Sequence, residues 1–237
     1  MTAHRDLSHE VSIAIDARTS LSGNLCVSQK AVGIVILAHV ASDARSLARN
    51  RELASTLLRA GLCTLHVDLL SPQEADADRF RRRLHFDVPL LGGRLILATM
   101  WLRRQPDVYD LPVGIFGANT AAAAALVAAA HETDRIGAVV TRSGRLDLVP
   151  RHEVSELRAP TLVIVGGADV PILAATRGAL PRFTCPTALE IIPGAAHLFE
   201  KPGALDQVSS LASSWFRREL SGEEAITEPL RPAASRH

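Results

Sequence analysis

The chain has 237 residues, of which 47% are apolar and 22% are charged, as in an ordinary globular domain. Its 26 Lys and Arg residues balance 25 Asp and Glu residues, which leaves a formal net charge of +1. A nucleic-acid-binding protein is expected to carry a basic face, and the aromatic content of 4% offers few platforms for base stacking. We therefore expect no nucleic-acid partner.

The cysteines and the chain start indicate the compartment. Three cysteines are present, Cys26, Cys63 and Cys185. They are too few and too scattered for a disulfide framework or a zinc site, so we expect reduced thiols, no metal and no cofactor. Residues 1–10 are polar and lack the apolar stretch of a signal peptide. The apolar runs 34–38 and 121–130 are shorter than the ~20 residues that span a bilayer. A cytoplasmic protein without membrane contact is expected.

The first predicted elements form a hairpin. Residues 11–15 alternate apolar and polar side chains, and residues 25–27 resume the alternation after Ser22, Gly23 and Asn24. Two alternating runs separated by a Gly-Asn pair predict two antiparallel strands joined at that pair.

Strands and helices then alternate along the chain. Short β-branched runs predict buried strands at 33–38, 63–68, 113–116, 136–140, 161–165 and 188–192. Helical periodicity predicts helices at 46–60, 91–104, 120–131, 172–180 and 204–220. Residues 71–88 are charged and irregular, and we interpret them as a surface excursion with a solvated run at Arg81, Arg82 and Arg83.

This order predicts an α/β fold. Strands that alternate with helices form right-handed βαβ units, and hence a mostly parallel sheet with helices on both faces and the antiparallel hairpin at one edge. We expect an N-terminal extension at 1–10, one domain at 11–220 and a disordered tail at 221–237, which is rich in Pro and Glu.

Three strand ends carry residues that suit catalysis. Ligand sites in parallel sheets lie at the carboxyl ends of strands. Gly117 and Ala121 flank Asn119 at the spacing of G-x-S-x-G, the motif that holds a nucleophile on a strained turn between strand and helix. Asp169 and His197 each follow a later strand. The order of position 119, acid and histidine is that of the α/β-hydrolase fold, in which the acid orients the imidazole for proton transfer at the elbow.

The sequence here resembles the dienelactone-hydrolase-like branch of the α/β-hydrolases, which includes small hydrolases fused to phosphoribosyltransferase domains. The resemblance covers roughly residues 11–220 by element order, and the stretches that carry it are 37–39, 46–51, 86–91, 117–121, 165–169 and 194–199. It implies an α/β-hydrolase fold and a small ester or lactone as substrate. It also implies an oxyanion hole made by the backbone N–H groups of Val40 and Thr120, with His39 beside the substrate.

Three positions depart from the family pattern. Asn119 stands where the family has the elbow serine, Ala121 replaces the glycine that ends the elbow motif, and Val40 replaces the glycine after His39. A carboxamide has no proton that His197 could remove near neutral pH, so ordinary acyl-enzyme hydrolysis is not expected. The elbow residue usually has a positive φ, which Asn tolerates better than most residues.

Two classes of function follow. As an enzyme, the chain would act on a small carbonyl compound through Asp169 and His197 by water activation, elimination or isomerisation, with Asn119 orienting the carbonyl or the water. As a pseudo-hydrolase, it would keep the pocket for binding or regulation. An engineered Ser→Asn variant, or conversion of Asn119 to a nucleophilic aspartate, remains open. In each case the partner is a small molecule, and a homo-oligomer is possible.

Other candidate residues have weaker signals. The side chain of Thr120 is expected to point away from the site, Ser143 is interpreted as a turn residue and Cys63 as core. Arg142 follows a strand and could bind an anionic substrate, although a surface ion pair would explain it equally well.

Overall fold

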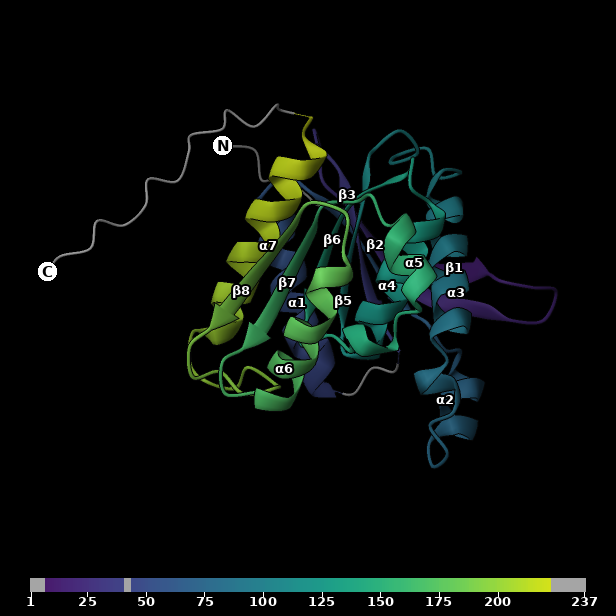
Figure 1. Ribbon diagram of the computed structural model, residues 1–237. Helices are drawn as coiled ribbons and strands as arrows, with labels where there is room; N and C mark the ends of the chain where they lie inside the picture. The colour runs from purple at the N-terminus through teal and green to yellow at the C-terminus, as the bar shows by residue number, and fades with distance from the viewer. Residues whose placement is uncertain (1–6, 41–43, 223–237) are drawn as a thin grey trace, which may run out of the picture.

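The computed structural model describes residues 7–40 and 44–222, which form one mixed sheet in the order β1-β2-β4-β3-β5-β6-β7-β8 (Figure 1). The strands are β1 (Leu7–Ala14), β2 (Ser20–Val27), β3 (Ile34–His39), β4 (Cys63–Asp68), β5 (Val113–Ala118), β6 (Ile136–Arg142), β7 (Thr161–Gly166) and β8 (Thr187–Ile192). The helices are α1 (Ala44–Arg59), α2 (Pro72–Asp78), α3 (Val88–Leu102), α4 (Thr120–His131), α5 (Arg151–Glu156), α6 (Val170–Ala179) and α7 (Ala204–Leu220).

Strand direction follows the predicted pattern. β2 pairs antiparallel with both β1 and β4, and every other pair in the sheet is parallel. The parallel strands carry continuous apolar runs because helices cover both of their faces. The predicted α/β-hydrolase architecture, with an N-terminal antiparallel hairpin, is confirmed.

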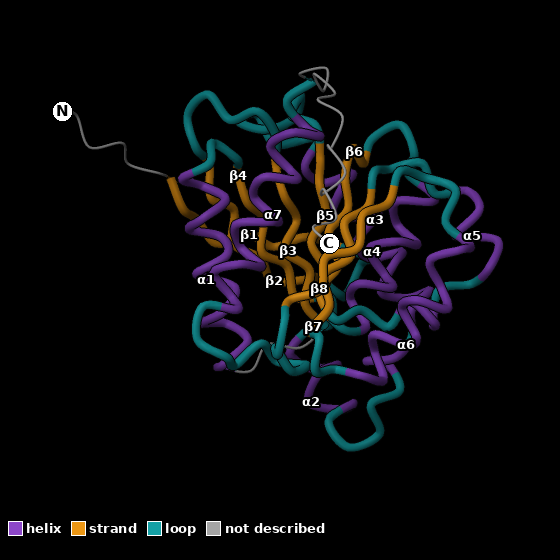
Figure 2. Tube along the Cα trace, turned by 60° about the vertical axis from the view of Figure 1, so that its left-hand side comes forward, coloured by secondary structure: helices purple, strands orange, loops and turns teal. Residues whose placement is uncertain are grey.

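Two helical layers enclose the sheet, as Figure 2 shows. Helices α1 and α7 cover one face, where Leu57 and Phe216 belong to a buried apolar cluster with β3, β5 and β6. Helices α3, α4, α5 and α6 lie on the other face and form the second cluster. Alanines fill most of α4, and residues 121–130 are all buried. Their small side chains let this helix approach the sheet closely.

The predicted turn at Ser22, Gly23 and Asn24 is wrong, because β2 runs through all three residues. The chain reverses earlier, where Asp16 Oδ1 accepts hydrogen bonds from the backbone N–H groups of Arg18 and Thr19 at 2.7 and 2.8 Å. Such an Asx turn needs no glycine. Gly23 serves packing instead, because a Cβ there would lie 2.7 Å from the backbone oxygen of His66 on β4.

The segment 71–88 is more ordered than the irregular excursion predicted. Ser71 and Glu74 form a capping box that starts α2, and Asp78 is buried, with its carboxylate accepting from the backbone N–H groups of Leu84 and His85. Local side-chain bonds to the backbone order this polar sequence, so apolar periodicity did not reveal it. The arginines at 81–83 are exposed, as predicted.

Several boundaries differ by a few residues. The helix predicted at 91–104 starts at Val88, because Asp87 Oδ1 accepts from the Leu90 N–H and Pro89 fits the first helical turn. β1 begins at Leu7, inside the segment predicted as an extension. Helices 120–131 and 204–220 have the predicted bounds. Of the predicted tail, residues 223–237 lie outside the described residues.

None of the described helices combines the length and apolarity needed to cross a bilayer.

Candidate active site

Asn119 occupies a sharp turn between β5 and α4. Its backbone has φ 54° and ψ −122°, and its side chain is exposed and does not cap α4. Backbone bonds hold the turn, since Asn119 N donates to Arg142 O at 3.3 Å and Asn119 O accepts from the N–H groups of Ala122 and Arg145, each at 3.2 Å. A Cβ on Gly117 would lie 2.5 Å from Ala121 O, so the turn requires glycine there. The geometry presents residue 119 at the carboxyl edge of the sheet.

Asp169 and His197 are brought together at the same edge. Asp169 follows β7 and precedes α6, His197 follows β8, and His197 Nδ1 lies 2.7 Å from Asp169 Oδ2. The Asp169 side chain is 8% exposed and that of His197 is 42% exposed. Nδ1–H donates to the carboxylate, which leaves the Nε2 lone pair as a proton acceptor.

Close packing of the two loops positions this pair. A Cβ on Gly166 would lie 2.4 Å from Ala195 O, so only glycine allows β7 to end so near the loop after β8. Backbone bonds from Ala168 N to Ala195 O and from Gly167 N to Ile192 O, both 2.9 Å, tie the loops together. The acid and the histidine therefore sit on connected backbone.

The two residues predicted to form the oxyanion hole follow the ends of neighbouring strands, Val40 after β3 and Thr120 after β5. Thr120 is the first residue of α4, so its N–H is one of the groups that the helix itself leaves unpaired. Val40 directly follows β3 and is buried, and residues 41–43 beyond it lie outside the described residues. Donation by these two N–H groups to a substrate oxygen stays a prediction.

His39 is held as a neutral ring. Its Nδ1 lies 3.2 Å from Asn50 Nδ2, which donates to it, so the ring proton is on Nε2. Burial, reinforced by His66 and Arg142, lowers the pKa of His39 to about 3. Its Nε2 is buried and lacks a hydrogen-bond partner within the described residues. Contact with a substrate, predicted from the sequence, stays a prediction.

Arg142 lies deeper than a surface ion pair would. Its guanidinium carbon is 5.9 Å from the ring centres of both Phe116 and Phe199. Burial and the nearby charge of Arg49 lower its pKa to about 10, so it remains a cation at neutral pH. No salt bridge joins it to a carboxylate within the part of the chain described. Its role in substrate binding also stays a prediction.

Sequence reasoning missed two neighbours of these residues. Asn50, buried on α1, fixes the His39 tautomer, and Phe199, buried with φ 54°, packs on Arg142 two residues after His197. Neither contact has a local signal, because the partners are brought together by the packing of α1 and of the loop after β8 on the sheet.

Ser143 is buried at φ 44°, in a turn as predicted, and Cys63 is core. Over residues 7–40 and 44–222, no three His, Cys, Asp or Glu side chains cluster to hold a metal.

Comparison with known proteins places the chain in a family. No family model matches the chain. A solved dienelactone hydrolase from Anabaena variabilis is 45% identical, with a TM-score of 0.86 over 91% of this chain and 99% of that protein. The esterase Est1E from Butyrivibrio proteoclasticus shares the fold, with a TM-score of 0.72 at 15% identity over 90% of this chain and 99% of its own.

Curated relatives are longer than this chain. Two proteins from Mycobacterium tuberculosis, provisionally named phosphoribosyl transferases, are each 46% identical over 202 residues. The match covers 85% of this chain but 44% of theirs, so the chain spans less than half of their length. Because the likeness to the Anabaena hydrolase covers nearly the whole of both proteins, the chain belongs to the dienelactone hydrolase-like family of α/β-hydrolases.

Proposed function

We propose that this protein acts on a small ester or lactone by general-base catalysis, without a covalent acyl-enzyme. The observation that carries the proposal is the 2.7 Å hydrogen bond between His197 Nδ1 and Asp169 Oδ2. A pair of this kind supports proton transfer at Nε2, because the carboxylate stabilises the imidazolium that forms. The ester or lactone class comes from the family resemblance, and the phosphoribosyl transferase name of the longer relatives does not enter the proposal.

Asn119 determines how the reaction proceeds. A side-chain amide is a poor nucleophile and gives up no proton at neutral pH, so no acyl-enzyme forms on it. Its NH₂ group can donate to a substrate carbonyl, and its oxygen can accept from a water. In the proposed step His197 Nε2 takes a proton from that water, the hydroxide adds to the carbonyl carbon, and the leaving oxygen recovers the proton from His197.

Four proteins test this proposal against small activated esters and lactones: the wild type, Asn119→Ser, His197→Ala and the double variant. Wild-type turnover is expected to be slow, to show no initial burst, to resist covalent serine reagents and to require His197. Asn119→Ser is expected to gain about 100-fold or more in rate together with labelling by the reagent, since the serine restores covalent catalysis. His152→Ala, which changes another exposed histidine, is the matched control and is expected to leave the rate unchanged.

Four results would contradict the proposal. Labelling of the wild type by a serine reagent would mean that another residue is the nucleophile. Wild-type turnover that does not depend on His197 would mean that another group is the base. Absence of turnover on every ester and lactone would favour the pseudo-hydrolase that only binds. A mass increase of about one dalton at Asn119 would reveal a carboxylate nucleophile instead.

A further inference from the structure

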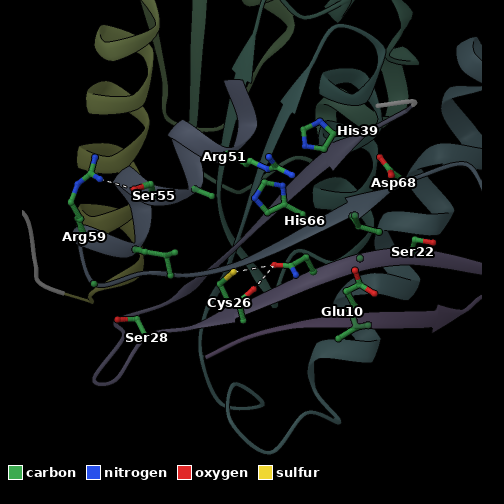
Figure 3. Close-up of a pocket in the computed structure, with 18 of the residues that line it drawn as sticks. Glu10, Ser22, Cys26, Ser28, His39, Arg51, Ser55, Arg59, His66 and Asp68 are labelled. Carbon is green, nitrogen blue, oxygen red and sulfur yellow. Dashed lines mark hydrogen bonds between the residues drawn. The ribbon is translucent and has the colours of Figure 1, made fainter. Parts of the chain in front are cut away.

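A cavity whose lining includes none of Asn119, Asp169 and His197 lies between α1 and strands β1, β2 and β4 (Figure 3). We name it the β2–α1 groove. Its volume is about 1030 Å³, which is at the upper end of the range for small-molecule sites. Across its floor Glu10, Asn24 and His66 form one cross-strand row, since Glu10 pairs with Asn24 and Asn24 with His66 in the strand register.

Most of the residues that line the groove are polar or charged, and several of them carry hydrogen-bond donors. Asn24 Oδ1 already accepts from Ser8 Oγ and Cys26 Sγ, both at 3.1 Å, so the amide NH₂ of Asn24 keeps its two donors. Arg51 reaches over the groove beside His66 and takes part in no salt bridge within the residues described. Small-molecule sites usually combine apolar surface with a few placed polar groups, and the unpaired donors here point to a ligand that carries hydrogen-bond acceptors.

Two histidines, His39 and His66, belong to the lining of the groove. His39 lines it, and Nε2 of this ring is a buried donor without a partner in the described residues. The ring centres of His39 and His66 are 6.0 Å apart, and burial keeps both rings neutral, with the pKa of His66 lowered to about 4. The two histidines therefore offer hydrogen bonds without charge.

The charges of the lining balance. Arg51 and Arg59 lie on the α1 wall, whereas Glu10 and Asp68 lie on the sheet. An anionic or cationic ligand would meet a charge of its own sign in the same groove, which repels it, whereas a hydroxyl group can donate to a carboxylate and accept from an amide or guanidinium. We infer that the β2–α1 groove binds the polyhydroxyl part of a small molecule, an uncharged sugar or the sugar portion of an ester.

Cys26 provides a direct test of occupancy. It lines the groove and is partly exposed, whereas Cys63 and Cys185 are buried, so a thiol reagent should modify one site in the native protein. D-Ribose, D-glucose and methyl glucoside are titrated against the rate of this modification and against backbone amide NMR shifts. Saturable protection of Cys26, with shifts confined to β1, β2, β4 and α1, is the expected result. Cyclohexanol and inorganic phosphate are expected to have no effect.

Variants locate the site. Arg51→Met and Asn24→Ala are each expected to weaken sugar binding about 10-fold, because each removes hydrogen-bond donors to the ligand. Arg104→Met changes an exposed arginine outside the groove and is the matched control. Absence of protection by all three sugars, equal protection by cyclohexanol or phosphate, or equal weakening by Arg104→Met would each overturn the inference.

The two sources of the sugar are separated by comparing glucose with 6-O-acetylglucose. Equal binding indicates that free sugar is the ligand. Tighter binding of the acetyl ester, with release of acetate that requires His197, indicates an ester. These binding measurements use the wild-type protein and need no turnover, so they can fail while the proposed hydrolysis stands, and the reverse also holds.

Discussion

Asn119 is the residue on which the chemistry depends, and its backbone conformation is unusual even for asparagine. Asparagine is enriched in the left-handed helical region, where ψ is about +30° to +60°. At φ 54° and ψ −122°, Asn119 lies outside that region and close to the first central position of a type II′ turn, which glycine dominates. The tolerance of asparagine for positive φ therefore does not explain its presence here. The strand–turn–helix geometry imposes this conformation, and any residue with a Cβ is strained in it.

We predict that Asn119→Gly raises the free energy of unfolding by about 1 kcal/mol, because strain of this kind costs about 1–3 kcal/mol and glycine avoids it. Asn119→Ala keeps the Cβ and is expected to show no such gain. Urea denaturation of the three proteins measures the difference. A glycine variant no more stable than the alanine variant would show that the turn is not strained.

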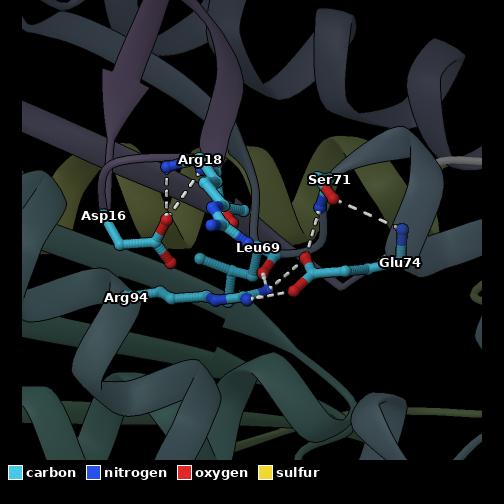
Figure 4. Close-up of polar contacts among 7 residues, drawn as sticks. Asp16, Arg18, Leu69, Ser71, Glu74 and Arg94 are labelled. Carbon is cyan, nitrogen blue, oxygen red and sulfur yellow. Dashed lines mark hydrogen bonds and ion pairs between the residues drawn. The ribbon is translucent and has the colours of Figure 1, made fainter.

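Among the elements, α2 is connected to α3 by polar side-chain contacts (Figure 4). Arg94 on α3 forms two hydrogen bonds to the carboxylate of Glu74 and donates to Leu69 O at 2.6 Å. Glu74 also accepts from Ser71 N at 2.9 Å, which links the helix start to the ion pair. The Arg94 side chain is 8% exposed, so its charge depends on Glu74 for compensation. The guanidinium beside Glu74 in turn lowers the pKa of that carboxyl group.

Glu74→Gln is predicted to cost about 2 kcal/mol of unfolding free energy, because it leaves the buried Arg94 cation unpaired while a glutamine can keep the capping box. Adding Arg94→Met should recover part of this loss. The matched control is Asp147→Asn in the exposed Arg145–Asp147 pair, with an expected cost below about 0.5 kcal/mol. Equal losses at the two sites in urea denaturation would contradict the buried ion pair.

At the scale of the whole molecule, folding keeps His39 neutral. The pKa of His39 is about 3 in the folded protein against an ordinary value of 6.5. Between these values the unfolded chain binds a proton that the folded protein does not, so this group favours unfolding increasingly as the pH falls. Its contribution is absent above the unfolded pKa, grows as the pH falls below about 6.5 and levels off near the folded pKa.

Lowering the pH from about 7.5 to about 5 should therefore cost about 2 kcal/mol through His39 alone. His39→Gln, which can still accept from Asn50, is predicted to lose that much less over the same interval. Urea titrations at a series of pH values measure both proteins. Identical pH dependence would show that His39 is protonated in the folded state.

The sequence predicted much of the fold and part of the site, for reasons visible at single elements. α4 and α7 have long apolar patterns with clear ends, and both were predicted with the observed bounds. The predicted closeness of Asp169 and His197 is also observed, because parallel strands bring their carboxyl ends to one edge. The turn after β1 was misplaced because a glycine needed for packing against β4 resembles a glycine needed for a turn.

By itself, the sequence determined the order of strands and helices, the strand ends that carry Asn119, Asp169 and His197, and the balance of charge. These features depend on residues close together in the chain, where periodicity and spacing are sufficient. Only the tertiary structure decided the Glu74–Arg94 pair, the neutral His39 and the β2–α1 groove. Each of these joins segments distant in sequence, and burial and pairing there depend on how the helices pack on the sheet, which no local pattern records.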